Sequence, residues 1–151
     1  MDQNVALRGN APAKIDDKGR LKVPNGFRAL IQDTYGRELY VTSLTGQSVL
    51  IYPMSVWQAI ERKLANMPSA HPAKHRYLDR VNFWGQTAEL DAQGRVVLPA
   101  RLREMAGMHG EVDVLGQYDF LEVWNHERFL TKLQNDPFTD DDARALSDFG
   151  I

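Results

Sequence analysis

The chain contains no cysteine among its 151 residues, which excludes disulfides and thiolate-bound zinc and suits a reducing compartment. It has no run approaching the roughly 20 apolar residues of a membrane-spanning helix, and its first residues, MDQNVALRGN, lack the apolar centre of a signal peptide. Phosphate-binding, dinucleotide-binding, nucleophile-elbow and His-Glu-x-x-His motifs are all missing. We therefore expect a cytoplasmic protein that is not an enzyme and that engages no membrane, small-molecule substrate or cofactor.

Patterns typical of metal ligands are also sparse. His71 and His75 have the spacing of two ligands on one helix face, but Pro72 lies between them and no third ligand is near in sequence. Zinc needs at least three protein ligands, and the Asp140–Asp142 run lacks the spaced ligands and glycine of a calcium loop. We expect no metal site and interpret the aspartates as a solvated acidic segment.

The net charge of −2 and the pI of about 6.1 hide two segments of opposite sign. Residues 8–28 hold six basic and two acidic side chains, a net charge of +4, whereas residues 136–151 hold one arginine against five aspartates, a net charge of −4. The overall acidity argues mildly against a nucleic-acid partner, which requires a basic surface. A nucleic-acid partner stays possible because of the basic segment, since the net charge averages over both segments.

The most informative feature that is present is an internal repeat. Residues 16–28 read DDKGRLKVPNGFR and residues 91–103 read DAQGRVVLPARLR, and the two segments align without a gap. The identical positions pair Asp16 with Asp91, Gly19 with Gly94, Arg20 with Arg95, Pro24 with Pro99 and Arg28 with Arg103. A second match aligns residues 49–57 with residues 121–129. One structural unit therefore occurs twice in the chain.

Each copy has the pattern of strand, turn, strand, short helix, strand, turn, strand and helix. Residues 16–19 and 91–94 have turn chemistry, since Asp bonds its own backbone and Gly accepts positive φ. Alternating and apolar runs predict strands at residues 20–23, 38–44, 48–52, 86–90, 95–98, 112–115 and 120–124. Helical spacing and capping signals predict helices at residues 24–32, from a Ser55–Gln58 capping box to Pro68, at 74–83, at 100–106 before Gly107, and after Asn125.

Strands this short do not form an independent sheet, so we expect the two copies to complete one another's sheet. The expected fold is mainly β with short peripheral helices, a shared barrel of two tandem repeats with pseudo-two-fold symmetry. We place the first repeat at residues 7–67, a linker and connecting helix at 68–84, and the second repeat at 85–134. Residues 135–151 are expected to be an acidic C-terminal tail, either mobile or separately docked.

The doubled motif Asp-x-x-Gly-Arg-apolar-x-apolar-Pro makes the chain resemble the bacterial MraZ proteins over residues from about 7 to 133. Arg8-Gly9-Asn10 and the passage from Gly116-Gln117 to Glu122-Val123-Trp124 add to the resemblance. It implies a double-split β-barrel of swapped hairpins, as in the AbrB-like transition-state regulators, and a ring-shaped homo-oligomer. It also implies binding to short direct repeats in double-stranded DNA upstream of the protein's own operon, in a division and cell-wall gene cluster, with repression of transcription and association with the nucleoid.

The resemblance assigns DNA contact to the hairpin loops, through Asp16 with Arg20 and through Asp91 with Arg95. The basic side chains around the first loop are candidate phosphate contacts, which steepen the salt dependence of binding without setting sequence preference. These additional candidates are Lys14, Lys18, Lys22 and Arg28.

The chain departs from the family pattern in two places. It carries a short N-terminal extension, Met1–Ala6, and the Asp17-Lys18 of its first loop is replaced by Ala92-Gln93 in the second. Because the second loop lacks one basic group, we expect the two loops to contribute unequally to DNA binding.

Two interpretations of the loop arginines stay open. The planar fork of Arg20 and Arg95 suits phosphate or guanine contact, whereas internal pairing with the loop aspartates would brace the hairpins, and both can hold together. Arg28 is open to a bracing role as well. For the whole protein, the alternative is a ring-forming scaffold or protein-interaction module without specific DNA binding. A DNA affinity that falls steeply with salt would argue against that alternative.

Overall fold

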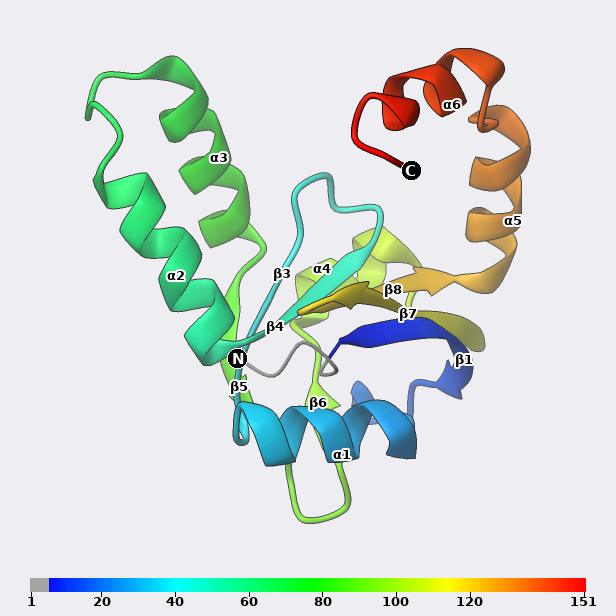
Figure 1. Ribbon diagram of the computed structural model, residues 1–151. Coiled ribbons are helices and arrows are strands. Elements are labelled where there is room, and N and C mark those ends of the chain that lie inside the picture. Colours follow the sequence, from blue (N-terminus) through cyan, green and yellow to red (C-terminus); the bar gives the residue numbers. More distant parts are fainter. Residues whose placement is uncertain (1–5) are drawn as a thin grey trace.

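The computed structural model describes residues 6–151, so Met1–Val5 of the N-terminal extension lie outside the described residues. Within that range the chain forms eight strands and six helices (Figure 1). The strands are β1 (Leu7–Lys14), β2 (Arg20–Lys22), β3 (Glu38–Thr42), β4 (Val49–Pro53), β5 (Gln86–Glu89), β6 (Arg95–Val97), β7 (Glu111–Tyr118) and β8 (Leu121–Asn125). The helices are α1 (Asn25–Thr34), α2 (Met54–Ala65), α3 (Pro72–Phe83), α4 (Ala100–Ala106), α5 (His126–Asn135) and α6 (Asp140–Ser147).

The strand pairing has the pseudo-two-fold symmetry that the repeat predicts. In the described chain one sheet has the order β1-β7-β8-β4-β3-β5, and β2 and β6 form a separate antiparallel ribbon. Exchanging β1 with β5, β7 with β3 and β8 with β4 reproduces the same order. The first strand of each repeat therefore pairs with the third strand of the other, β1 with β7 and β5 with β3. The repeats are interlocked, and the expected mainly β fold of two tandem repeats is confirmed.

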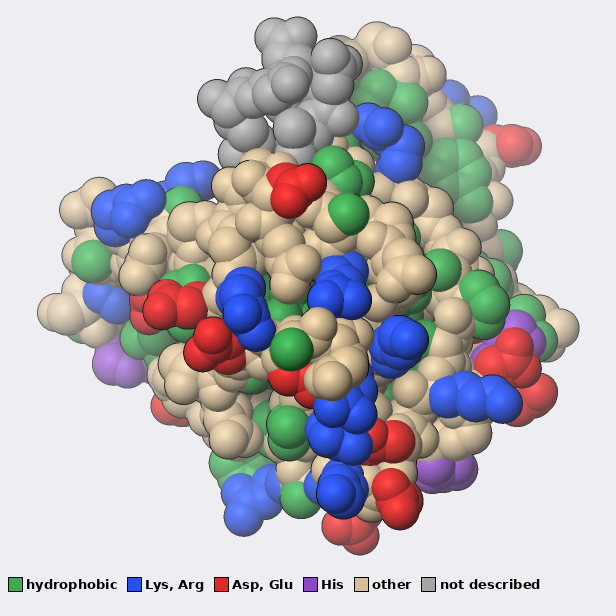
Figure 2. Space-filling model, turned by 90° about the horizontal axis from the view of Figure 1, so that it is seen from below, with side chains coloured by type: hydrophobic (Ala, Val, Ile, Leu, Met, Phe, Trp, Pro, Cys, Tyr) green, Lys and Arg blue, Asp and Glu red, His purple; other side chains and the backbone are tan. Residues whose placement is uncertain are grey.

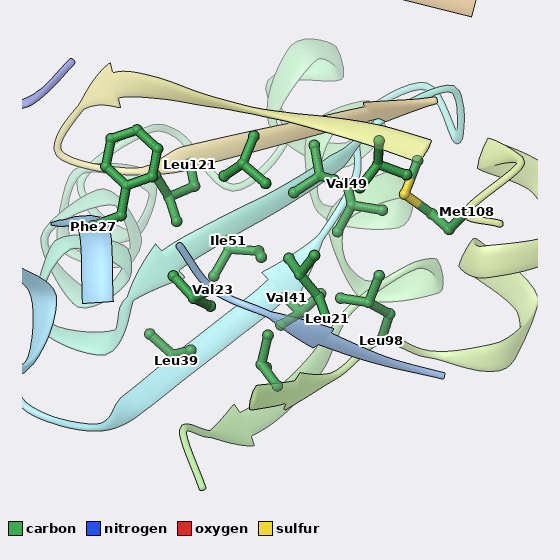
Figure 3. Close-up of a cluster of buried hydrophobic side chains, with 14 of the residues drawn as sticks. Leu21, Val23, Phe27, Leu39, Val41, Val49, Ile51, Leu98, Met108 and Leu121 are labelled. Atoms are coloured by element: carbon green, nitrogen blue, oxygen red, sulfur yellow. The ribbon is translucent and has the colours of Figure 1, made fainter. Parts of the chain in front are cut away.

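The main core fills the space between the six-stranded sheet and the ribbon. Leu21 and Val96 face each other across β2 and β6 and are 0% and 1% exposed. Figure 3 shows Leu21 among side chains of the sheet, including Val41 and Val49. Since successive side chains of a strand point to opposite faces, burial of Leu21 and Val96 turns the basic residues of the ribbon outward.

Three helices begin directly after a proline. Pro24, Pro53 and Pro99 are the N-cap residues of α1, α2 and α4, with φ between −52° and −57° and no side-chain capping bond. The predicted capping box at Ser55 and Gln58 is wrong. The proline ring fixes φ near the helical value, so α2 begins at Met54, immediately after β4 ends and before Ser55 can serve as the cap.

The linker after α2 is shorter than the sequence pattern indicated. The Nδ1 of His71 accepts a hydrogen bond from the backbone N–H of Ala73 at 3.1 Å, and Pro72 takes the first helical position. As a result α3 begins two residues earlier than predicted. It returns along α2, where Tyr77 stacks on Trp57 with ring centroids 6.4 Å apart.

The C-terminal residues form two helices, of which the sequence pattern predicted only the first. Asn125 caps α5 as expected, because its side chain accepts the backbone N–H of Arg128 at 3.1 Å. Beyond α5, Thr139 and Asp142 form a capping box that begins α6. Neither helix buries a residue. In Figure 1 the two helices stand on the opposite side of the molecule from α2 and α3.

Candidate nucleic-acid interface

One carboxylate organises the loop between β1 and β2. The Oδ1 of Asp16 accepts the backbone N–H groups of Lys18 at 3.0 Å and Arg20 at 2.8 Å. Its Oδ2 accepts the Nε–H of Arg20 at 2.7 Å. Asp16 therefore fixes both the backbone of the loop and the direction of the arginine side chain.

The loop between β5 and β6 repeats this arrangement. The Oδ1 of Asp91 accepts the backbone N–H groups of Gln93 at 2.9 Å and Arg95 at 2.8 Å, and its Oδ2 accepts the Nε–H of Arg95 at 2.8 Å. The internal Asp–Arg pairs that the sequence left open are thus present in both loops. They orient each arginine through Nε and leave the outer edge of the guanidinium to other partners.

Hydrogen bonding lowers the pKa of both loop carboxyls. The largest cause is the backbone N–H of Arg20 on Asp16 and that of Arg95 on Asp91, and the arginine side chains act in the same direction. Partial desolvation opposes the shift. Both carboxylates are therefore ionised at neutral pH, where they hold the loops in shape.

We expect this stabilisation to be lost in acid. A carboxyl whose pKa is lowered in the folded state stabilises the fold above its ordinary pKa of 3.8, and the contribution disappears as the pH falls through the folded-state value. Urea unfolding at about pH 5, 4 and 3 should show a parent free energy of unfolding that drops below about pH 4. An Asp16→Asn/Asp91→Asn protein should show a shallower drop, and parallel profiles for the two proteins would contradict the assignment.

Each loop is also braced by an arginine from the other repeat. The side chain of Arg103, on α4, lies against Gly19 and donates from Nε to the carbonyl of Leu98 at 3.0 Å. Arg28, on α1, lies against Gly94 and donates from Nη2 to the carbonyl of Ala92 at 2.8 Å. This contact gives Arg28 the bracing role that the sequence had left open. Arg103 was not a sequence candidate, although its alignment with Arg28 in the repeat was the signal that could have identified it.

The two loops flank the ribbon and are tied to it. The carbonyl of Gly19 accepts the N–H of Leu98 at 3.0 Å, and the carbonyl of Gly94 accepts the N–H of Val23 at 2.9 Å. In the register of the ribbon Arg20 is opposite Val97, and Lys22 is opposite Arg95. These four side chains share the outward face, because Leu21 and Val96 occupy the inward one.

The surface around the ribbon is basic. Figure 2 looks at the molecule from below, the side of α1 and the β5–β6 loop in Figure 1, and shows Lys and Arg side chains gathered along the middle of this face. The ribbon and its two loops, with the two bracing arginines, hold six basic residues against three acidic ones. The basic residues are Lys18, Arg20, Lys22, Arg28, Arg95 and Arg103, and the acidic ones are Asp16, Asp17 and Asp91.

The two loop arginines differ in how firmly they are held. The Nη2 of Arg95 donates to the Oε1 of Gln93 at 3.1 Å in addition to the Asp91 pair. The first repeat has Lys18 at the equivalent position, and an ammonium group cannot accept a hydrogen bond. The outer guanidinium edge of Arg20 is therefore the more available of the two.

Lys14, another sequence candidate, is not part of the ribbon but of the six-stranded sheet. It is an exposed residue at the end of β1 and stands opposite Glu111 of β7 in the sheet register. A residue of opposite charge therefore faces it across the strands. Lys18 is exposed in the first loop, close to Arg20, and Lys22 is on the ribbon itself.

Neither a metal centre nor a membrane-spanning helix is found in residues 6–151. No group of three or more His, Cys, Asp or Glu side chains in this range is arranged to hold a metal ion. Among the helices in the same range, none is both long and apolar enough to cross a membrane.

The fold and this surface define a class: a β protein of two interlocked tandem repeats that presents a basic two-stranded ribbon. A family model described as "MraZ protein, putative antitoxin-like" matches residues 6–80 and 85–149, one match on each repeat. The chain belongs to the MraZ family, as its motifs indicated.

Similar proteins from several bacteria share almost the whole length. The chain is 47% identical to "Transcriptional regulator MraZ" of Acidobacterium capsulatum over 96% of its own residues and 99% of that protein. It is 46% identical to the protein of the same name from Koribacter versatilis, with the same coverage, and 38% identical to that of Herpetosiphon aurantiacus over 91% and 94%. These names support a transcription regulator and denote no enzyme.

Proposed function

We propose that this chain is a sequence-specific DNA-binding repressor of its own division and cell-wall gene cluster. In this proposal it binds short direct repeats in promoter DNA through residues 16–20 and 91–95, displayed on a ring-shaped homo-oligomer. The observation that carries the proposal is the ribbon that bears Arg20, Lys22 and Arg95 outward, with an aspartate-oriented arginine beside each loop.

The dimensions of the ribbon suit the major groove. Two strands about 5 Å apart fit a groove about 12 Å wide. Arg20, held at Nε by Asp16, keeps its remaining N–H groups for guanine or phosphate. Lys18 and Lys22 add phosphate contacts beside it, and Arg28 supports the second loop from behind.

One ribbon supplies too few contacts for tight binding, since each contact of this kind contributes about 1–3 kcal/mol. Several copies on one assembly make the later contacts intramolecular and raise the overall affinity without any new contact. Direct repeats in DNA match this arrangement, because each box meets the ribbon of one copy in the same orientation.

The test is a gel-shift titration with the DNA just upstream of the gene against scrambled DNA of equal length. We expect preference for the upstream DNA, and an affinity that falls steeply with salt in proportion to the number of phosphate contacts. The mass of the free protein is measured in the same buffers. An intact oligomer that shows no preference even at low salt would overturn the proposal and favour the scaffold alternative.

A further inference from the structure

The chain carries two exposed apolar surfaces that have no role in the proposed DNA contact. The first is the C-terminal arm (residues 136–151), where Phe138, Phe149 and Ile151 are 70%, 81% and 83% exposed. The second is the Trp84 band (Leu44, Phe83, Trp84 and Met105), in which Phe83 and Met105 are 56% and 54% exposed. Large apolar side chains grouped on a surface indicate a contact with another molecule.

The Trp84 band is continuous across the turn between β3 and β4. Phe83 meets the ring of Trp84 edge-on, with centroids 4.7 Å apart. Trp84 and Met105 both lie against Gly46, which has no side chain to separate them. Rings and a flexible thioether form the kind of surface that accepts apolar side chains of a partner.

A groove of about 710 Å³ continues from this band along α5. Met105 belongs to both, and Trp124, Arg128 and Lys132 also line the groove. Trp124 is 6% exposed, and its Nε1 is the one buried side-chain polar atom among the described residues that has no hydrogen-bond partner. An indole N–H in such a place normally has an acceptor, so the wall of the groove at Trp124 holds a donor whose hydrogen-bonding capacity is unused.

Charge indicates which segment fits the band. Arg101 stands over the ring of Phe83, with its Cζ 4.7 Å from the centroid. The helices that carry Phe83 and Met105, α3 and α4, hold five basic and two acidic residues, a net charge of +3, whereas the C-terminal arm has a net charge of −4. The arm therefore combines exposed aromatic residues with the charge opposite to that of the band's surroundings.

We propose that the C-terminal arm of one copy docks on the Trp84 band of a second copy. Within one chain both surfaces remain exposed, so the arm does not cover the band of its own copy. Because the two surfaces differ, the contact is head-to-tail. A pair of copies joined in this way still has one free arm and one free band, which allows growth and closure into a ring. This inference rests on the assembly part of the proposed function, for which it names the surfaces.

The experiment uses the full chain and two separately defective variants. Phe138→Asp/Phe149→Asp damages the arm, and Phe83→Asp damages the band; all three positions are exposed, so the fold should be retained. Sedimentation velocity should show self-association about thirtyfold weaker for each variant, as expected when a central aromatic anchor is lost. Tyr118→Asn is the matched control, because Tyr118 is an exposed aromatic residue outside both surfaces. Its φ of 74° suits asparagine, so the variant should fold and keep the oligomer mass of the parent.

Mixing the two defective variants gives the decisive result. One brings an intact band and the other an intact arm, so a head-to-tail contact predicts a species of two chains that cannot grow further. Variants that keep the parent's mass, or a mixture that stays monomeric, would overturn the proposal. DNA preference that is absent from a fully assembled parent would instead count against the proposed function alone, so the two failures are distinguishable.

Discussion

An Arg20→Ala protein should fold and assemble like the parent but bind the upstream DNA at least about fivefold more weakly, the lower limit of the roughly 1–3 kcal/mol expected for an arginine contact to a base. Several copies bind together in the proposed complex, so the loss multiplies over the engaged ribbons. The effect on stability should be small, because a partly exposed ion pair such as Arg20 with Asp16 contributes about 1 kcal/mol or less. Gel shift, thermal melting and oligomer mass on the same samples check all three expectations.

The second loop provides the matched comparison. Arg95→Ala removes the same side chain from the same local geometry, but there the outer edge is already engaged by Gln93. We expect a smaller loss of affinity than for Arg20→Ala. Arg20→Lys keeps the charge and loses the planar fork, so it should retain non-specific binding and lose preference for the upstream DNA. An Arg20→Ala protein that binds as tightly as the parent at equal salt would refute the loop assignment.

Gly19→Ala is expected to be a strongly damaging small substitution beside the ribbon. Gly19 has φ +79°, where an L-residue costs about 1–2 kcal/mol. A Cβ there would also come within 2.6 Å of the Nε of Arg103, which must move and give up its bond to the carbonyl of Leu98. Loss of that bond adds about 1 kcal/mol. We expect a lower urea midpoint together with weakened DNA binding, because the Arg20 backbone N–H follows directly.

Gly36→Ala separates the two causes. Gly36 has φ +96°, but a Cβ there meets nothing within 4 Å, so this variant carries the backbone strain without the displaced arginine. It should cost roughly 1 kcal/mol less than Gly19→Ala and leave DNA binding unchanged. Equal destabilisation in the two variants would show that the Arg103 brace contributes nothing.

Much of the fold was predictable because the repeat is specified by short-range features: turn residues, helix caps and the alternation of polar and apolar residues. Alternation at Leu21 and Val96 placed these residues in the core, and Gly107 and Asn125 ended and began helices as predicted. The predictions that failed concern where helices begin. Pro53 is the N-cap residue of α2 in place of Ser55. Thr139 and Asp142 begin a helix in the segment that was expected only to be an acidic tail, mobile or separately docked.

In the candidate site, too, short-range contacts were predictable and contacts between the two repeats were not. Asp16 with Arg20, and Asp91 with Arg95, are four residues apart, so their pairing is a short-range property that the sequence alone could suggest. The contacts of Arg28 and Arg103 could not be predicted in this way, because each side chain lies against the loop of the other repeat. Arg28 and its partner Ala92, for example, are 64 residues apart in the chain.

The sequence by itself determined that one unit is built twice, with a basic first loop, an acidic end and no catalytic motif. Only the tertiary structure decided that the first strand of each repeat pairs within the other, that β2 and β6 meet as one ribbon, and that Arg20, Lys22 and Arg95 share a face. The physical reason is that turns, caps and alternation depend on neighbours a few residues apart. Strand exchange instead depends on which pairing buries Leu21, Val96 and the sheet residues together, and that is a property of the whole chain.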